Sequence, residues 1–142
     1  MEKITQEASN IMKERFGKDN IIALATVDKD MPAVRNVNAY YEDGAFYIIT
    51  YALSNKMKQL EKNNKVAIAG DWFTAHGKGI NLGYFEKEEN KAIADKLRQA
   101  FAEWINNGHN NFADKNTCIL CIELTDGVLF SNGTRYEIDF TK

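Results

Sequence analysis

Two lysines open a predicted helix at the end where helices normally carry acidic residues. The chain leaves an extended segment at Thr50 and enters this helix through Ser54, with Lys56 and Lys58 in its first turn. The amino end of a helix presents unpaired N–H groups and a partial positive charge, so cations there are unfavourable. A bound anion such as phosphate would offset these lysines. The alternative is an ordinary helix capped by Ser54, with solvated lysines.

A second predicted helix, from residue 85 to about residue 107, shows the usual distribution of charge. It opens with Glu86, Glu88 and Glu89 and carries Lys96 and Arg98 further along, which agrees with the helix dipole. Its apolar residues recur at helical spacing and are expected to pack against the core. They are Ile93, Leu97, Ala100, Phe101 and Trp104.

Charge and composition exclude several classes of protein. The 142 residues are 44% hydrophobic with a single proline, which predicts one globular domain over residues 1–142. The 18 basic and 20 acidic side chains give a net charge of −2, so neither nucleic acid nor an anionic membrane is expected as a partner. No apolar run has the length of a signal peptide or a membrane span, and we expect a cytoplasmic protein.

A histidine and two cysteines are further candidates for chemistry. His76 is the candidate catalytic proton donor, and the alternative is a solvated loop histidine. Cys118 and Cys121 form a C-x-x-C within an apolar, β-branched run, where residues three apart face opposite sides of a strand. We therefore expect buried, inert thiols rather than a redox pair, and no metal site.

Extended segments with turn sequences between them dominate the rest of the chain. Residues 21–27, 32–41 and 46–51 predict three antiparallel strands, and residues 66–69 and 78–84 predict two more. Residues 117–124 and 128 to about 140 predict a last hairpin that turns at Asp126-Gly127. Six or seven strands with three helices predict a β-dominated α+β domain, and closure into a barrel would remove the exposed edges.

Five segments carry a family resemblance, and they span residues 21 to about 70. They are Ile22-Ala23-Leu24-Ala25-Thr26, Pro32-Ala33-Val34-Arg35-Asn36-Val37, Phe46-Tyr47-Ile48-Ile49-Thr50, Ser54-Asn55-Lys56 and Val66-Ala67-Ile68. Their order resembles the FMN-binding split barrel family of pyridoxamine 5′-phosphate oxidase, with its small general-stress and nitroimidazole-resistance-type members. Beyond residue 70 the resemblance rests on element order alone. It implies an antiparallel split β-barrel with flanking helices.

The resemblance also implies a cofactor site. In this family a basic residue on the second strand, a threonine that ends the third, and the residues that open the next helix hold the FMN phosphate. These positions are Arg35, Thr50, Ser54 and Lys56 here, and the backbone of residues 36–38 would meet the polar edge of the ring. The predicted FMN-binding set is Arg35, Asn36, Val37, Asn38, Ile49, Thr50, Ser54, Asn55 and Lys56.

The chain departs from the oxidase itself at two places. The oxidase reads its substrate partly through an arginine and a histidine near the carboxyl end, whereas residues 133–142 contain no histidine. Oxidation of vitamin B6 is therefore not expected. A second basic residue of the oxidase would fall near Tyr40, which removes one phosphate contact.

The activity that the resemblance implies is that of a flavin oxidoreductase. It would be a homodimer with FMN at the subunit interface, taking hydride from a reduced nicotinamide and passing electrons to a small acceptor. An aromatic surface patch of Trp72, Phe73, Tyr84 and Tyr51 is the expected interface. One alternative is a non-enzymatic flavin-binding or stress-associated protein. Another is a haem-binding barrel, against which the Thr50, Ser54 and Lys56 set argues.

Overall fold

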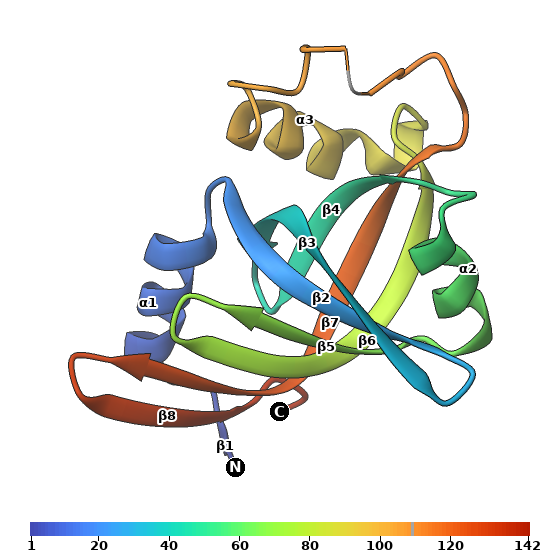
Figure 1. The fold of residues 1–142 in the computed structure, drawn as a ribbon. Coiled ribbons are helices and arrows are strands. Elements are labelled where there is room, and N and C mark those ends of the chain that lie inside the picture. Colours follow the sequence, from blue (N-terminus) through green and yellow to red (C-terminus); the bar gives the residue numbers. More distant parts are fainter. Residues whose placement is uncertain (109) are drawn as a thin grey trace.

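Six antiparallel strands close into a barrel in the order β7-β4-β3-β2-β5-β6, with β6 pairing back to β7 (Figure 1). The structure is a computed structural model that describes residues 1–108 and 110–142. The predicted β-dominated α+β barrel is confirmed. Its strands are β2 (Asn20–Asp28), β3 (Met31–Glu42), β4 (Ala45–Tyr51), β5 (Lys65–Gly70), β6 (Phe73–Tyr84) and β7 (Thr117–Ser131).

Two further strands and three helices surround the barrel. Strand β8 (Thr134–Asp139) extends the sheet from β7, and β1 (Glu2–Lys3) pairs with it in parallel. The helices are α1 (Gln6–Phe16), α2 (Asn55–Lys62) and α3 (Lys91–Ala100), with a short 3₁₀ turn η1 (Glu88–Asn90) before α3. Within the described residues, no helix is long and apolar enough to cross a membrane.

The predicted hairpin turn at Asp126-Gly127 is wrong, because β7 continues through both residues. The chain turns instead at Asn132 and Gly133, whose φ angles of 49° and 80° suit a two-residue hairpin loop. Gly127 serves packing rather than turning. A Cβ atom there would lie 2.9 Å from Cε1 of Phe73 and 3.1 Å from Cε2 of Phe140.

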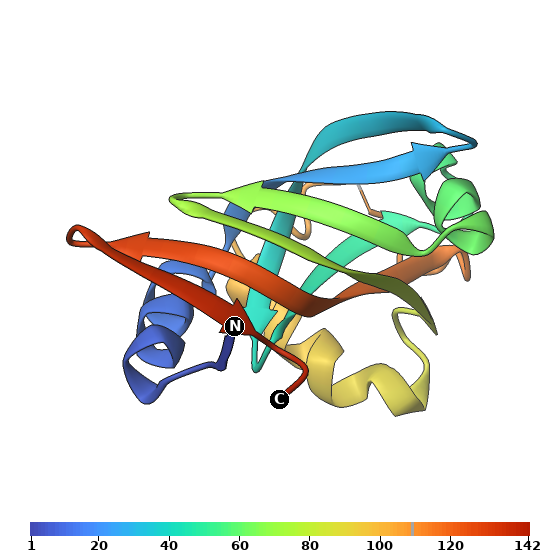
Figure 2. The ribbon, with the colours of Figure 1, turned by 90° about the horizontal axis from the view of Figure 1, so that it is seen from below.

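Strand β7 belongs both to the barrel and to the terminal hairpin (Figure 2). It pairs with β4 as far as Glu123 and with β8 from Asp126 onward. Thr125 is the extra residue of a bulge against β6, where His76 pairs with Asp126 but Gly77 pairs with Leu124. A bulge bends its strand, and this one lies where β7 leaves β4 for β8.

Helices α1 and α2 pack on the barrel core. The hydroxyl of Thr5 caps α1 by accepting from the N–H of Ala8 at 3.1 Å, and the buried face of α1 carries Met12 and Phe16. Met57 and Leu60 of α2 are buried in the same cluster as the inward side chains of the strands. Because α2 is fixed by these apolar contacts, the residues that open it have defined positions beside the barrel.

Helix α3 is shorter than the predicted helix from residue 85 to about 107. The amide of Asn90 donates to the carbonyls of Leu82 and Tyr84, at 3.0 and 2.9 Å, which ties the start of α3 to the end of β6. After Ala100 the chain continues in turns, with Phe101 and Ile105 buried in a second apolar cluster outside the barrel. Trp104 is partly buried against this cluster. The predicted burial of the apolar stripe is thus confirmed in part, but not the helix length.

Candidate functional site

Strands β3 and β4 separate soon after the turn that joins them. They pair only from Tyr40 to Glu42 on β3 and from Ala45 to Tyr47 on β4. Strand β2 continues along the other edge of β3 to Met31, and β7 continues along β4 to Tyr51. Because alternate residues of a strand direct their N–H and C=O groups to either edge, β3 offers backbone donors and acceptors to this opening.

A pocket of about 350 Å³ lies at this opening. Both strands line it, and so do the first turn of α2 and the segment that follows α3. Its lining is half apolar and half polar, and small-molecule sites likewise combine apolar walls with placed polar groups. Its residues are Val37, Asn38, Ile48, Ile49, Lys56, Trp104, Asn107 and Asn110.

Lys56 brings positive charge to the pocket from α2. Its Nζ donates to Oγ1 of Thr50, the penultimate residue of β4, at 2.6 Å. In the described part of the chain, none of the ion pairs includes Lys56 or Arg35. Desolvation by burial, and secondarily the charge of Arg35, lower the pKa of Lys56 below its ordinary value. The protein thus holds a cation whose charge is not balanced by an acidic side chain.

Ser54 occupies the N-cap position of α2, but its side chain does not cap the helix. Its Oγ atom is buried and has no hydrogen-bond partner among the described residues. Buried hydroxyl groups are normally paired, so an unpaired one at a helix N-terminus needs an explanation. The first turn of α2 also lacks acidic residues, as the sequence indicates. The Ser54 hydroxyl and the first N–H groups of α2 thus lack partners within the described part of the chain, at the end of a helix that favours an anion.

Arg35 lies at the same end of the barrel but is engaged with protein groups. Its Nη1 donates to the carbonyl of Leu24 at 3.2 Å and to Oγ1 of Thr26 at 2.7 Å, and its Nη2 donates to Oε1 of Gln59 at 3.2 Å. The hydroxyl of Thr26 also bonds to Oε1 of Gln59, at 2.5 Å. Arg35 therefore contributes charge and connects β2 and β3 to α2. Among the described residues its second Nη2 N–H and its Nε N–H make no hydrogen bond, so both donors remain.

A carboxylate connects two walls of the pocket. Asp19, in the loop between α1 and β2, accepts from Nδ2 of Asn38 at 3.0 Å and from the indole N–H of Trp104 at 2.9 Å. The Trp104 ring stacks on Phe101 with ring centroids 4.7 Å apart. One acidic residue thus joins β3 to the segment that follows α3.

The structure brings together most of the predicted residues. Val37, Asn38, Ile49 and Lys56 line the pocket, Thr50 bonds to Lys56, and Ser54 opens the same helix. Three predicted residues lie elsewhere. Asn36 is exposed outside the lining, and Asn55 lines a separate groove with exposed Lys29, Lys58 and Lys62. His76 bonds to Asp126 at 2.9 Å on β6, outside the pocket lining, so its catalytic role stays a prediction.

Several site residues escape sequence reasoning. Thr26 and Gln59 hold Arg35, and the only signal for Thr26 is a hydroxyl within an otherwise apolar strand. Trp104 belongs to a stripe that the sequence assigns to core packing, and it does contact the core while it also lines the pocket. Asp19, Asn107 and Asn110 lie in loops and give no signal.

The chain belongs to the pyridoxamine 5′-phosphate oxidase family, whose sequence model matches residues 9–128. This confirms the resemblance seen in the sequence. No curated protein sequence gives a significant match.

Three solved structures show the same fold. General stress protein 26 of Bacillus anthracis strain Sterne is 16% identical, with a TM-score of 0.67 over 94% of this chain and 100% of that chain. A FAD-binding protein from Mesorhizobium loti is 12% identical, with a TM-score of 0.66 over 84% of this chain and 91% of that chain. A heme binding protein from Mycobacterium smegmatis is 14% identical, with a TM-score of 0.66 over 88% of this chain and 54% of that chain.

Proposed function

We propose that this member of the pyridoxamine 5′-phosphate oxidase family binds FMN between β3 and β4 and acts as a flavin oxidoreductase. One observation carries the proposal. The buried Oγ of Ser54 has no partner and lies at a helix N-terminus that carries Lys56, which has no acidic partner among the described residues. Phosphate oxygens accept hydrogen bonds and carry negative charge, so a phosphate satisfies both features.

The groups at the start of α2 suit a phosphate because they are hydrogen-bond donors and phosphate oxygens are acceptors. Ser54 offers its hydroxyl, the first turn of α2 offers backbone N–H groups, and Lys56 offers an ammonium group held at Thr50. Arg35 adds positive charge nearby while its guanidinium remains hydrogen-bonded to Thr26 and Gln59. The protein thus supplies position and charge at the phosphate.

The pocket beside Lys56 suits the ring part of the cofactor. Val37, Ile48 and Ile49 supply apolar surface, and the open edge of β3 supplies backbone groups for a polar ring edge. Bound FMN would supply two-electron redox chemistry, taking hydride from a reduced nicotinamide for a small acceptor. The chain's own residues bind the phosphate, orient the ring and shield one side of it from water.

We also propose a homodimer, but with an interface at a different surface from the aromatic patch that the sequence predicts. The expected aromatic patch does not form, because Phe73 is buried in the barrel and Tyr84 bonds to the carbonyl of Phe112. The outer face of β2, β3 and β5 instead carries several small apolar residues, with exposed Asn36 beside them and Lys65 at the start of β5. Directly paired residues cross it in the row Val34, Ala25, Ala67 and His76, and Val34 is 70% exposed.

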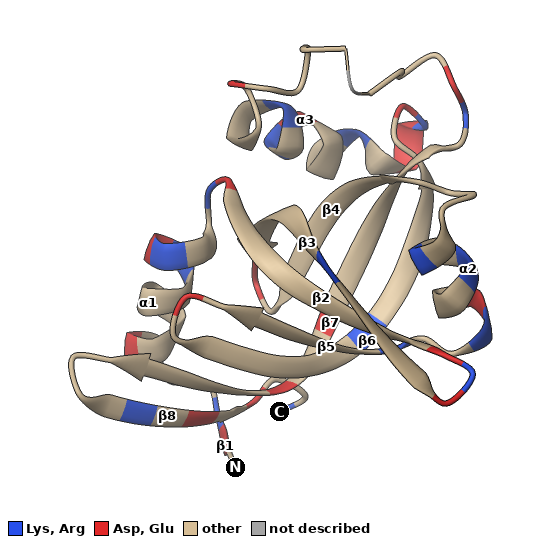
Figure 3. Ribbon diagram, in the orientation of Figure 1, with Lys and Arg blue, Asp and Glu red and all other residues tan. Residues whose placement is uncertain are grey.

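The middle of β2 and β5 carries no charged residue (Figure 3). A face without charge can lie against a copy of itself without like-charge repulsion, and a C₂ dimer buries the same patch on both subunits. His76 lies at the edge of this face. In the proposed dimer it would approach the partner subunit, where a role as proton donor is open to test.

The alternative functions make different demands on the site. A non-enzymatic protein that stores or senses flavin would use the same phosphate groups, and turnover alone separates it from an oxidoreductase. A haem-binding barrel finds less support. The described residues that line the pocket include no His, Cys, Met or Tyr, the side chains that serve as axial haem ligands.

The test is the identity of the bound cofactor. We expect the purified protein to show the visible spectrum of a flavin, and mass analysis after denaturation to return FMN. Calorimetry on the apo-protein should give a lower Kd for FMN than for riboflavin, which lacks the phosphate. A haem spectrum, or equal affinity for the two flavins, would overturn the assignment. Anaerobic reduction of the bound flavin by reduced nicotinamide, faster than that of free FMN, would support an oxidoreductase.

A further inference from the structure

The carboxylate of Asp19 has a role that the phosphate site does not explain. It lies in a loop and accepts hydrogen bonds from Asn38 and Trp104, two residues that line the same pocket from different parts of the chain. Each oxygen serves a different partner: Oδ1 accepts from Asn38 and Oδ2 accepts from Trp104. The two contacts are thus made without competition for one atom.

The contact with Asp19 fixes the orientation of the Asn38 amide. An ionised carboxylate can only accept hydrogen bonds, so the NH₂ group of Asn38 must face Asp19 and its carbonyl oxygen must face away. Asn38 lines the pocket, and besides the second N–H of its NH₂ group it offers its carbonyl oxygen as an acceptor. The acceptor selects a ligand that offers an N–H or O–H donor. The ring system of an oxidised flavin carries one such donor, the imide N–H.

The same carboxylate fixes Trp104 at the pocket wall. The indole N–H points at Asp19, one face of the indole stacks on Phe101 with an interplanar angle of 29°, and the side chain borders the pocket. An indole held by a hydrogen bond and by a stacked neighbour loses little further freedom when a ligand binds. A planar ring gains the most from such a wall.

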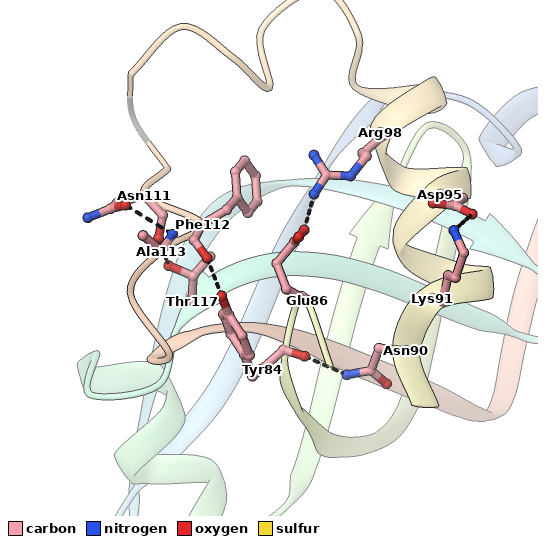
Figure 4. Close-up of polar contacts among 10 residues, drawn as sticks. All are labelled: Tyr84, Glu86, Asn90, Lys91, Asp95, Arg98, Asn111, Phe112, Ala113 and Thr117. Atoms are coloured by element: carbon pink, nitrogen blue, oxygen red, sulfur yellow. Dashed lines mark hydrogen bonds and ion pairs between the residues drawn. The ribbon is translucent and has the colours of Figure 1, made fainter. Parts of the chain in front are cut away.

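The far end of the segment that carries Trp104 is held independently (Figure 4). The guanidinium of Arg98 bonds to Glu86 and lies 5.0 Å from the ring centroid of Phe112, whose backbone carbonyl accepts from the hydroxyl of Tyr84. Thr117 donates to the carbonyl of Asn111 at 2.7 Å. Because these contacts do not involve Asp19, loss of the carboxylate should release Trp104 while Phe112 stays in place.

We infer that Asp19 is a positioning residue, which orients Asn38 and Trp104 for a planar ligand ring that bears an N–H donor. The inference rests on the proposed function, and it concerns the ring side of the pocket rather than the phosphate side. It separates two kinds of recognition. Ser54 and Lys56 select for the phosphate, whereas Asp19 supports the ring regardless of the phosphate.

The test compares Asp19→Ala and Asp19→Asn with the wild type, and uses Asp30→Ala in an exposed turn as the matched control. The chain has two tryptophans, so a Trp72→Phe background isolates the emission of Trp104. We expect Asp19→Ala to shift the Trp104 emission of the apo-protein to the red. It should raise the Kd values of riboflavin and FMN alike by about tenfold, so that the ratio of the two Kd values stays unchanged. Asp19→Asn keeps one acceptor oxygen, so its flavin affinity should lie between those of the wild type and Asp19→Ala.

A second probe tests the donor on the ligand. Wild-type protein should bind N3-methylriboflavin about tenfold more weakly than riboflavin, and Asn38→Leu should bind both equally. If Asp19→Ala shifts the emission but binds both flavins as the wild type does, Asp19 is only structural and the inference fails. If the wild type binds neither flavin, the proposed function fails and the inference with it. A changed ratio of FMN to riboflavin affinity would place Asp19 on the phosphate side, which also contradicts the inference.

Discussion

The ammonium group of Lys56 is hydrogen-bonded to the hydroxyl of Thr50 at 2.6 Å, and none of the described acidic side chains forms an ion pair with it. Thr50 is the penultimate residue of β4 and Lys56 lies in the first turn of α2, so this contact joins the two elements that flank the proposed phosphate site. Such an arrangement costs stability in the absence of a ligand, because a partly buried charge is incompletely compensated. The proposed phosphate would offset this charge.

Removal of the Lys56 charge should weaken FMN binding selectively. A hydrogen bond to a charged group contributes about 1.5–3 kcal/mol, so Lys56→Ala should raise the Kd of FMN about tenfold or more and leave that of riboflavin nearly unchanged. Lys58→Ala is the matched control, because Lys58 is an exposed lysine two residues along the same helix. Calorimetry on the three proteins measures the effect. Equal losses for both flavins would place the phosphate elsewhere.

Ser54→Ala should separate ligand binding from helix capping. Because the Ser54 hydroxyl makes no cap hydrogen bond, its loss should change the free energy of unfolding by less than about 0.5 kcal/mol, whereas FMN affinity should fall severalfold. Thr5→Ala removes a cap that is present and should cost about 1 kcal/mol. Urea denaturation of the apo-proteins compares the two variants. A loss at Ser54 as large as that at Thr5 would show that Ser54 caps α2 in solution.

Stability at alkaline pH should report the unbalanced charge of Lys56. Burial lowers its pKa in the folded protein below the ordinary 10.5, so in the pH range between these two values the unfolded chain binds more protons. The charge therefore destabilises the fold fully below the lowered pKa, and the penalty disappears as pH rises to about 10.5. Apo Lys56→Met should therefore have a higher free energy of unfolding than the apo wild type at pH 7. The difference between the two proteins should be smaller at pH 10. Urea denaturation at both pH values measures the difference, and an advantage that grows with pH would contradict the assignment.

A methyl group at Gly127 should overpack the barrel end. The added carbon would lie 2.9 Å from Cε1 of Phe73 and 3.1 Å from Cε2 of Phe140, both too close for unstrained contact. We expect Gly127→Ala to lower the free energy of unfolding by about 1–3 kcal/mol. In the Phe140→Leu background the same change should cost less, which a double-mutant cycle measures. Purely additive costs would show that Phe140 is not part of the conflict.

Assembly should depend on the outer face of β2, β3 and β5. Light scattering should return about twice the monomer mass of 16.1 kDa at micromolar concentration. Val34→Glu places a charge on both sides of the proposed interface and should give monomers. Phe130→Glu is the control and should leave the dimer intact, since Phe130 lies on the terminal hairpin with its ring against Trp72 and not on β2, β3 or β5. A wild-type monomer would contradict the proposed interface.

The residues of the proposed anion site carry local sequence signals, whereas those of the proposed ring side carry few. Thr50 near the end of β4, Ser54 at the N-cap and Lys56 in the first turn of α2 all lie within seven residues, and the sequence alone shows them. Asp19 meets Asn38 and Trp104 across 19 and 85 residues of chain. Contacts of that separation arise from the closed barrel and leave no local pattern.

The barrel class also follows from local patterns, whereas its details do not. Alternating and apolar runs identify the strands, but Asp126-Gly127 has the composition of a hairpin turn and lies within β7 because Phe73 and Phe140 need the space above Gly127. In the same way, the helical stripe that includes Phe101 continues to be buried after α3 has ended. In both cases tertiary packing overrides a correct local preference.

The position of β7 in the chain sets when the binding site can form. Strands β4 and β6 both pair with β7, which is the last of the six barrel strands to be synthesised, so each retains an open edge until residues 117–131 are available. Open edges invite pairing with other chains. Helix α2 also packs its Met57 and Leu60 in one cluster with Leu120 and Ile122 of β7. The proposed cofactor site is therefore expected to form only after β7 has been synthesised, and a chain stalled before residue 117 should aggregate whether or not FMN is supplied.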